Sequence, residues 1–292
     1  MSSASEANCN SSEHCLDKCN ENTKVAEIQR ILIEKYRKNE TLFDEFDVNK
    51  IVKDEKYVNS YLMRQKCNLN DTVSMIENAL IWRKEHCLSK LCETSFSREF
   101  YEIGALFIQG IDIEDNILLF VRAKYSSCDK KCREAFRRTA AYFMFKAHEN
   151  ALYENRNGWT LFMDMSDVRI SECDILEFFN ILKILVNYIP SGLKRIIIFQ
   201  MPSFVKIFMK IGTAVLPTDW KQIIAFADSN DITKYIAVDQ LPHFITKTGE
   251  SFVADIPANV KCFDECDCEV IGIKNEDKFA FKSLIAKWKS LQ

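Results

Sequence analysis

Short apolar runs alternate with helical patterns from residue 105 to residue 236, and no other feature of the sequence limits the fold as strongly. The runs Ala105–Gln109 and Ile117–Arg122 flank a turn and predict a hairpin. Strands alternating with helices predict an α/β fold with parallel crossover connections. The further strands are expected at Trp159–Met163, Arg195–Gln200 and Gln222–Ala227, and the helices at 130–154, 171–188, 203–216 and 229–236.

The first ninety residues show only helical patterns. Val25, Ile28 and Leu32 form an apolar stripe, and similar spacing returns over residues 57–62 and 73–81. Residues 1–23 are rich in Ser, Asn and Glu, a composition typical of disorder. We therefore predict a disordered tail followed by a small helical unit.

Glycine is scarce, which excludes the common phosphate-binding loops. The chain has seven glycines, and no two lie closer than six positions, whereas dinucleotide turns and P-loops need closer pairs. The G-x-S-x-G and H-E-x-x-H patterns are also absent. Asp164 with Asp167, or His148 with Glu149, could serve acid–base chemistry, but no nucleophile or metal set accompanies them. We expect no catalytic residue and no enzyme activity.

Charge and hydropathy limit the partners and the compartment. The chain carries 39 Lys and Arg against 42 Asp and Glu, a net charge of −3, which does not indicate nucleic-acid binding. The first residues lack the apolar core of a secretory signal. The longest uncharged runs are about ten residues, whereas a membrane span needs about twenty. We expect a cytoplasmic, monomeric protein with no nucleic-acid partner.

The twelve cysteines include two terminal groups. Without a secretory signal, they are expected to be reduced thiols. One alternative is a zinc site or a redox-sensitive clasp, but the spacings C-x5-C-x3-C and C-x3-C-x-C match no standard zinc module. We expect no metal site, unless the two tails meet in space and bring six thiols together. The groups are Cys9, Cys15, Cys19 and Cys262, Cys266, Cys268.

A series of motifs identifies a family. W-R-K-E (82–85) closes the helical unit, and G-x-D-x-x-x-N (110–116) precedes a strand and a long aromatic helix. Then follow F-M-D-M-S (162–166), N-Y-I-P-S-G-L-K-R-I-I-I-F-Q-M-P (187–202) and D-Q-L-P (239–242). This order resembles the CRAL-TRIO (Sec14-like) lipid-binding family. N-x-L-x-F-x-R-x-K-Y (116–125) is similar to CRAL-TRIO domains found beside a motile sperm domain.

The resemblance implies a mixed, mostly parallel sheet of about five strands, flanked by helices, with a gate helix over a lipid cavity. It implies a non-catalytic protein that binds one lipophilic ligand and transfers or presents it between membranes, through peripheral contact with their surfaces. The expected parts are the tail (1–23), the helical subdomain (24–95), the CRAL-TRIO domain (96–250) and a C-terminal extension with an amphipathic helix (251–292).

The family position of the gate is residues 203–216, where apolar residues share one helical face. Such a face could cover a lipid when closed and meet a bilayer when open. The same residues could instead pack as ordinary core. The gate candidates are Phe204, Ile207, Phe208, Ile211 and Val215, and the cavity candidates are Phe143, Met144, Phe162, Phe178 and Phe199.

The headgroup positions depart from the family pattern. Phosphatidylinositol-binding members have Glu after Tyr-x-Pro and Lys at the start of the strand after the gate. Here Ser191 and Gln222 occupy these positions, with Lys221 beside the second. The resemblance therefore leaves the cargo open between another phospholipid and a neutral lipophile.

Two alternatives remain. The fold could persist as an interaction module for a membrane or protein, with a cavity that no longer carries cargo. The apolar stripe of 276–291 could lie on an anionic membrane, although packing on its own domain is the commoner arrangement.

Overall fold

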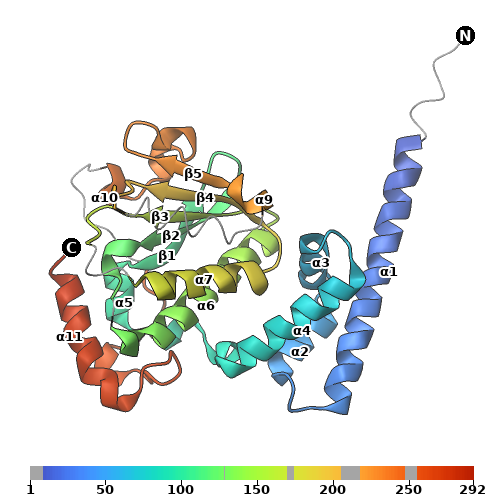
Figure 1. Ribbon diagram of the computed structural model, residues 1–292, viewed down its shortest axis with the longest axis horizontal. Coiled ribbons are helices and arrows are strands. Elements are labelled where there is room, and N and C mark those ends of the chain that lie inside the picture. Colours follow the sequence, from blue (N-terminus) through green and yellow to red (C-terminus); the bar gives the residue numbers. More distant parts are fainter. Residues whose placement is uncertain (1–8, 128, 170–173, 205–217, 247–254) are drawn as a thin grey trace, which may run out of the picture. The chain divides into compact units, whose positions relative to one another are not determined.

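The computed structural model describes residues 9–127, 129–169, 174–204, 218–246 and 255–292. These residues form two compact units, which divide after Glu85 and are each considered by itself. The division follows residue 85, rather than residue 95 as the sequence suggests. The helices of the first unit and the α/β fold of the second are drawn in Figure 1.

The first unit contains α1 (Cys9–Lys38), α2 (Glu45–Lys53), α3 (Glu55–Arg64) and α4 (Leu69–Glu85). The expectation of a disordered tail over 1–23 is wrong from residue 9 onward, because α1 already begins there. Once a helix is nucleated, each added residue contributes a further hydrogen bond, which lets polar sequence extend it. The fully buried core side chains include Ile28, Val58, Leu62 and Ile76.

Arg83, the arginine of W-R-K-E, fastens α4 to α2. Its Nε and Nη2 donate to the two carboxylate oxygens of Asp47 at 2.9 and 2.8 Å. Both side chains are buried, and such bidentate pairs are geometrically specific. The motif therefore has a structural role inside the first unit.

The second unit alternates strands and helices. In chain order it contains α5 (Arg98–Ile103), β1 (Leu106–Ile111), β2 (Asn116–Arg122), α6 (Arg133–Tyr153), β3 (Gly158–Asp164), α7 (Ile175–Asn187), β4 (Leu193–Phe199), α9 (Thr218–Lys221), β5 (Ile224–Ala227), α10 (His243–Thr246) and α11 (Lys278–Lys289).

The strands form one five-stranded sheet in the order β1-β2-β3-β4-β5. β1 is antiparallel to β2, and the other pairs are parallel. The predicted hairpin and the mixed, mostly parallel sheet are confirmed. Helices α6 and α7 pack together on one face, and α6 contacts β1, β2 and β3.

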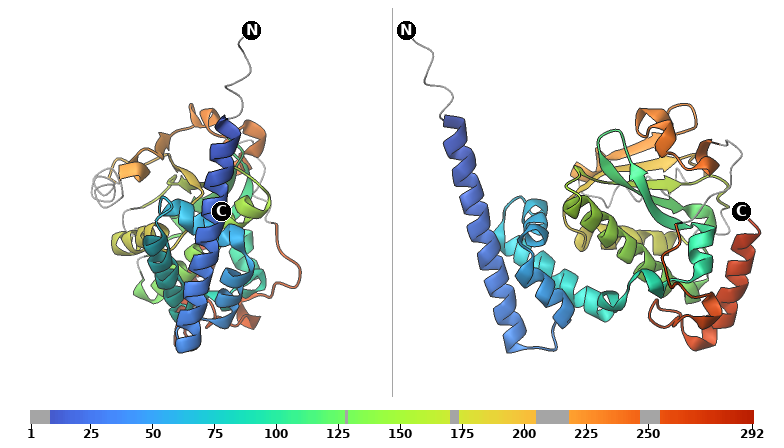
Figure 2. Two further views of the ribbon diagram at one scale, coloured as in Figure 1. Left: turned by 90° about the vertical axis from the view of Figure 1, so that its right-hand side faces the viewer. Right: turned by 180° about the vertical axis from the view of Figure 1, so that it is seen from behind.

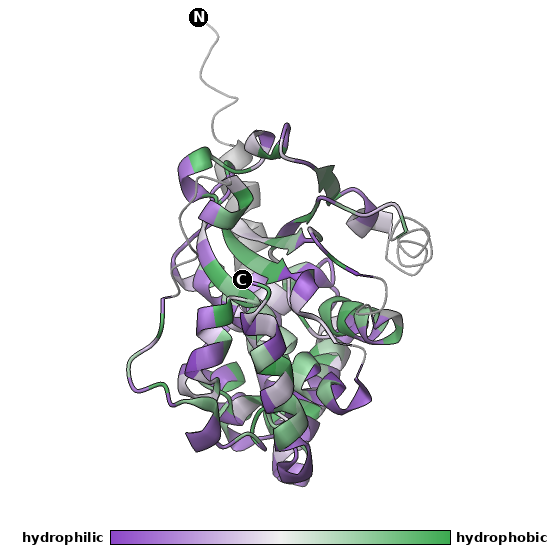
Figure 3. Ribbon diagram, turned by 90° about the vertical axis from the view of Figure 1, so that its left-hand side faces the viewer, coloured by the Kyte–Doolittle hydropathy of each residue, from purple (hydrophilic) through white to green (hydrophobic). Residues whose placement is uncertain are grey.

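Each strand divides its side chains between two faces. The neighbouring residues Phe120, Phe162 and Ile197 point away from α6 and α7, where they pack against the segment 232–245. The next residues along these strands, Val121, Met163 and Ile198, point to the face that α6 and α7 cover. Both faces are therefore apolar, and Figure 3 shows these strands coloured mainly as hydrophobic.

Asp112 of the G-x-D-x-x-x-N motif links the turn between β1 and β2 to the neighbouring strand β3. Its carboxylate accepts hydrogen bonds from the backbone and side chain of Asn116, and from Thr160 Oγ1 of β3 at 2.7 Å. Because Asp112 is buried, these donors satisfy a charge that would otherwise be costly to desolvate. This motif also is structural.

The C-terminal extension packs on the second unit. Arg98 N donates to Lys261 O at 2.8 Å, and Phe263 N donates to Glu99 Oε2 at 2.9 Å. Helix α11 contacts α5, as the view from behind in Figure 2 shows. Phe281, Ile285 and Trp288 are buried, which confirms that this amphipathic stripe packs on its own domain.

Candidate functional site

An internal cavity of about 300 Å³ lies in the second unit, between the sheet and α6 with α7. Its lining is mainly apolar, and it collects side chains from residue 96 to residue 288. The parallel strands contribute through the carboxyl-terminal halves of β2, β3 and β4. These floor residues are Leu119, Val121, Leu161, Met163 and Ile198.

The two helices form the next walls. Phe136, Ala140 and Met144 of α6 recur every four residues, so they share one helical face. Helix α7 is apolar over most of its surface and adds four residues, Phe178, Ile181, Leu182 and Leu185. Ion pairs tie these helices: Arg133 binds Asp174 through Nε at 2.6 Å, and Arg137 binds Glu177 through Nε at 2.6 Å.

The last wall comes from the C-terminal extension. Ionic and polar contacts hold it, including Lys289 Nζ to Glu102 Oε2 at 2.9 Å and Lys124 Nζ to the Leu291 carbonyl at 3.0 Å. The apolar stripe over 276–291 was the only sequence signal for this wall. Its lining residues are Phe263, Ile271, Ile273, Phe281, Ile285 and Trp288.

A model of the CRAL/TRIO domain matches residues 101–246, half of the chain. The chain belongs to the CRAL/TRIO family. The crystal structure of Sfh5 is similar, with a TM-score of 0.53 at 9% sequence identity, over 92% of this chain and 98% of that chain. At this identity the likeness shows the fold alone. The C-terminal wall lies outside the matched residues, so this CRAL/TRIO domain completes its cavity with its own extension.

Two predicted cavity residues of the CRAL/TRIO domain line the cavity, and three do not. Met144 and Phe178 are in the lining. Phe162 and Phe199 belong to the core on the opposite face of the sheet, because strand side chains alternate. Phe143 instead packs against Phe96 and Phe100, with ring centroids 5.5 and 5.7 Å apart. We correct the placement of these three.

The gate candidates mostly lie outside the described residues. Phe204 is half-buried in a turn and is not part of the lining. Nothing is described for the other four, Ile207, Phe208, Ile211 and Val215.

The headgroup candidates are not brought to the cavity. Ser191 precedes β4, and Lys221 and Gln222 precede β5, where both are exposed. All three therefore lie at the amino ends of the strands, whereas the cavity lies under their carboxyl halves. None of the three is among the residues that line the cavity.

Asp164, one of the two acidic residues considered for acid–base chemistry, has a structural role at the end of β3. Asp164 ends β3, is buried, and accepts a hydrogen bond from Ser166 N at 2.9 Å. Burial raises the pKa of its carboxyl group. Within the described ranges, no three His, Cys, Asp or Glu side chains are grouped to hold a metal ion. In the same ranges, no helix is long and apolar enough to cross a bilayer.

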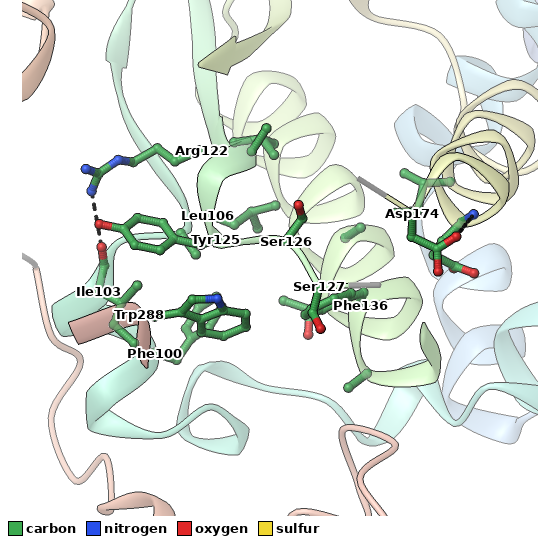
Figure 4. A pocket seen from close by; sticks show the side chains of 18 of the residues that line it. Phe100, Ile103, Leu106, Arg122, Tyr125, Ser126, Ser127, Phe136, Asp174 and Trp288 are labelled. Carbon is green, nitrogen blue, oxygen red and sulfur yellow. Dashed lines mark hydrogen bonds between the residues drawn. The ribbon is translucent and has the colours of Figure 1, made fainter. Parts of the chain in front are cut away.

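Polar side chains that the sequence analysis missed lie at the edge of the cavity. Arg122 and Tyr125 border the lining at one end, and Ser126, Ser127 and Asp174 lie elsewhere along it (Figure 4). The only sequence signal for Arg122 and Tyr125 is the R-x-K-Y segment, which begins at the last residue of a buried strand. An apolar chamber with few polar groups can orient an amphiphilic molecule.

Proposed function

We propose that this CRAL/TRIO domain binds one lipophilic molecule in the cavity and transfers or presents it between membranes, without catalysing a reaction. The observation that carries the proposal is the apolar chamber, which is built from the sheet, α6, α7 and the C-terminal extension. Burial of ligand hydrocarbon there is favourable by about 25 cal/mol per Å² removed from water.

The proposed role extends to the location of the protein and to its contact with membranes. The protein would act as a cytoplasmic monomer that contacts membranes peripherally through the 203–216 region. The finer resemblance of residues 116–125 to CRAL-TRIO domains that accompany a motile sperm domain supports action near membranes. Ser191 and Gln222, in place of the charged pair, favour a cargo other than phosphatidylinositol.

The alternative of an interaction module with a filled core has little support. That module would need the space between sheet and helices to be packed with side chains. A cavity of about 300 Å³ instead falls at the lower end of the range for ligand pockets, about 300–1,000 Å³.

Native mass spectrometry of the purified full chain, with identification of the extracted lipids, tests the proposal. Leu182→Trp places a bulky ring in the cavity wall and should abolish lipid loading. Leu176→Trp is the matched control on the same helix, because Leu176 is 66% exposed. The proposal fails if the wild-type chain carries no lipid and accepts none from mixed vesicles.

A further inference from the structure

Two buried polar side chains at one end of the cavity lack partners for atoms that normally have them. Arg122 is 6% exposed and Tyr125 is 3% exposed, and both border the lining. Among the described residues, neither Arg122 Nε nor the Tyr125 hydroxyl makes a well-aligned hydrogen bond, although the two side chains lie close enough to interact with each other. A buried donor without an acceptor is destabilising, so such groups indicate a missing acceptor.

The surroundings of Arg122 fix its position but give its charge no direct ion-pair partner. Its Nη1 donates to the Ile103 carbonyl at 3.2 Å, a hydrogen bond drawn in Figure 4. Its Cζ lies 3.9 Å from the Phe244 ring centroid and 4.8 Å from that of Tyr125. None of the ion pairs within 4.0 Å that join described residues includes Arg122. Burial lowers the pKa of this guanidinium group, and the nearby Tyr125 and Asp164 offset only part of that effect.

Tyr125 brings a second donor to the same place. Its ring packs edge-on against Trp288, with 6.4 Å between centroids, so the C-terminal extension holds it in position. Burial raises the pKa of its hydroxyl, which stays protonated near neutral pH and is able to donate. A guanidinium beside a phenol is suited to an oxyanion, because both groups donate hydrogen bonds.

The nearby charges limit the anion to a single charge. Arg122 faces Asp164 across the β2–β3 pair, and Lys124 is influenced by both Asp167 and Asp164. Two cations therefore lie near two carboxyl groups. A dianion would be repelled by these carboxylates, whereas a monoanion would be repelled less and would satisfy the unpartnered donors.

We propose that Arg122 and Tyr125 bind the carboxylate of a single-chain lipophile whose hydrocarbon part fills the cavity. This inference rests on the proposed function and names the ligand class for that site. The modest volume of the cavity favours one chain over two. A monoanionic phosphate ester offers the same acceptor chemistry, so the test separates the two headgroups.

The experiment is a fluorescence titration of the full chain with cis-parinaric acid and, in parallel, with its methyl ester. Both probes have the same polyene chain, so the ratio of their dissociation constants reports the headgroup alone. We expect the wild-type chain to bind the acid at least tenfold more tightly than the ester at pH 7.4. A charge-assisted hydrogen bond contributes an effect of this size.

Two variants assign that preference to residues. Arg122→Gln should bring the ratio close to one, and Tyr125→Phe should reduce it about three- to tenfold. The affinity for the ester should stay within about twofold of wild type in both. Tyr101→Phe is the matched control, because the buried Tyr101 hydroxyl donates to the Glu93 carbonyl, away from the lining. Tyr125→Phe keeps the test decisive even if Arg122→Gln fails to fold.

Each other outcome overturns a distinct claim. Equal binding of acid and ester by the wild-type chain overturns the carboxylate anchor but leaves lipid binding intact. A preference that survives Tyr125→Phe and Arg122→Gln unchanged also overturns it. If dodecyl phosphate displaces the probe more strongly than dodecanoate, the anchor serves a phosphate ester instead. If neither probe binds, the proposed function itself fails.

Discussion

The Trp288 indole stacks on the Phe136 ring, with 6.1 Å between the centroids and 28° between the planes. Phe136 belongs to α6 and Trp288 to α11, so this contact joins the C-terminal extension to a helix of the CRAL/TRIO domain. Both rings line the cavity. The extension is therefore part of the chamber and of the fold.

Replacing the indole should destabilise the second unit. Trp288→Ala removes a side chain that is only 6% exposed and leaves a larger void, so we expect a loss of about 3 to 5 kcal/mol in the free energy of unfolding. Urea denaturation measures this loss. Phe279→Ala is the control on the same helix, because Phe279 is 82% exposed and should change stability by no more than about 0.5 kcal/mol. Equal effects of the two changes would contradict a wall role for α11.

Removal of one partner from the buried ion pair of the first unit should strongly reduce the free energy of unfolding. Asp47→Ala leaves Arg83 charged and buried, which costs about 3 to 5 kcal/mol. The double variant Asp47→Leu with Arg83→Met removes both charges and should recover most of that loss. Thermal unfolding of the three chains, followed by circular dichroism, measures this. A double variant less stable than Asp47→Ala would show that the pair itself is strongly stabilising.

Stability should depend on Glu134 in acid. The hydrogen bond with His86, with help from Arg138, lowers the pKa of the Glu134 carboxyl from 4.5 to about 2. Because the folded state holds the ionised form, this stabilisation is complete above about pH 4.5 and is lost as the pH falls towards 2. The difference in unfolding free energy between wild type and Glu134→Gln should therefore shrink over that window. Denaturant titrations at pH 6, 4 and 3 test this, and a constant difference would refute it.

Thiol reactivity should differ between two cysteines. Hydrogen bonds with Ser95 and Thr94 lower the pKa of the exposed Cys92 thiol, whereas burial raises the pKa of Cys132 to about 11. Since the thiolate is the nucleophile, Cys92 should react with iodoacetamide well before Cys132 at pH 7.5. Peptide mass spectrometry over a time course measures both rates. Faster labelling of Cys132 in the folded chain would contradict the assignment.

The strands and their connections could be predicted from the sequence, but the face of each strand could not. An exposed strand marks its buried side by alternating polar and apolar residues, whereas β2, β3 and β4 are covered on both faces. Phe162 and Met163 are therefore equally apolar neighbours, and only Met163 lines the cavity. The sequence analysis favoured Phe162, which has the larger side chain, but Phe162 belongs to the core on the opposite face of the sheet.

The helices presented a related difficulty. Helix α6 carries apolar residues around much of its surface, so Phe143 and Met144 both looked suitable. Contact with Phe96 and Phe100 determines the place of Phe143, and these are long-range contacts that no local pattern encodes. For the same reason the stripe of α11 predicted that the helix would pack, but not that it would close a cavity.

The order of the lining residues along the chain has a consequence for synthesis. A ribosome produces the floor and helix walls, residues 96–198, well before residues 263–288. Until that later stretch emerges, the nascent domain exposes an apolar trough, whereas the mature domain has a further wall over it. Such exposed surface is prone to aggregation. The interval before closure is also a time when a hydrophobic molecule can enter without displacing any wall.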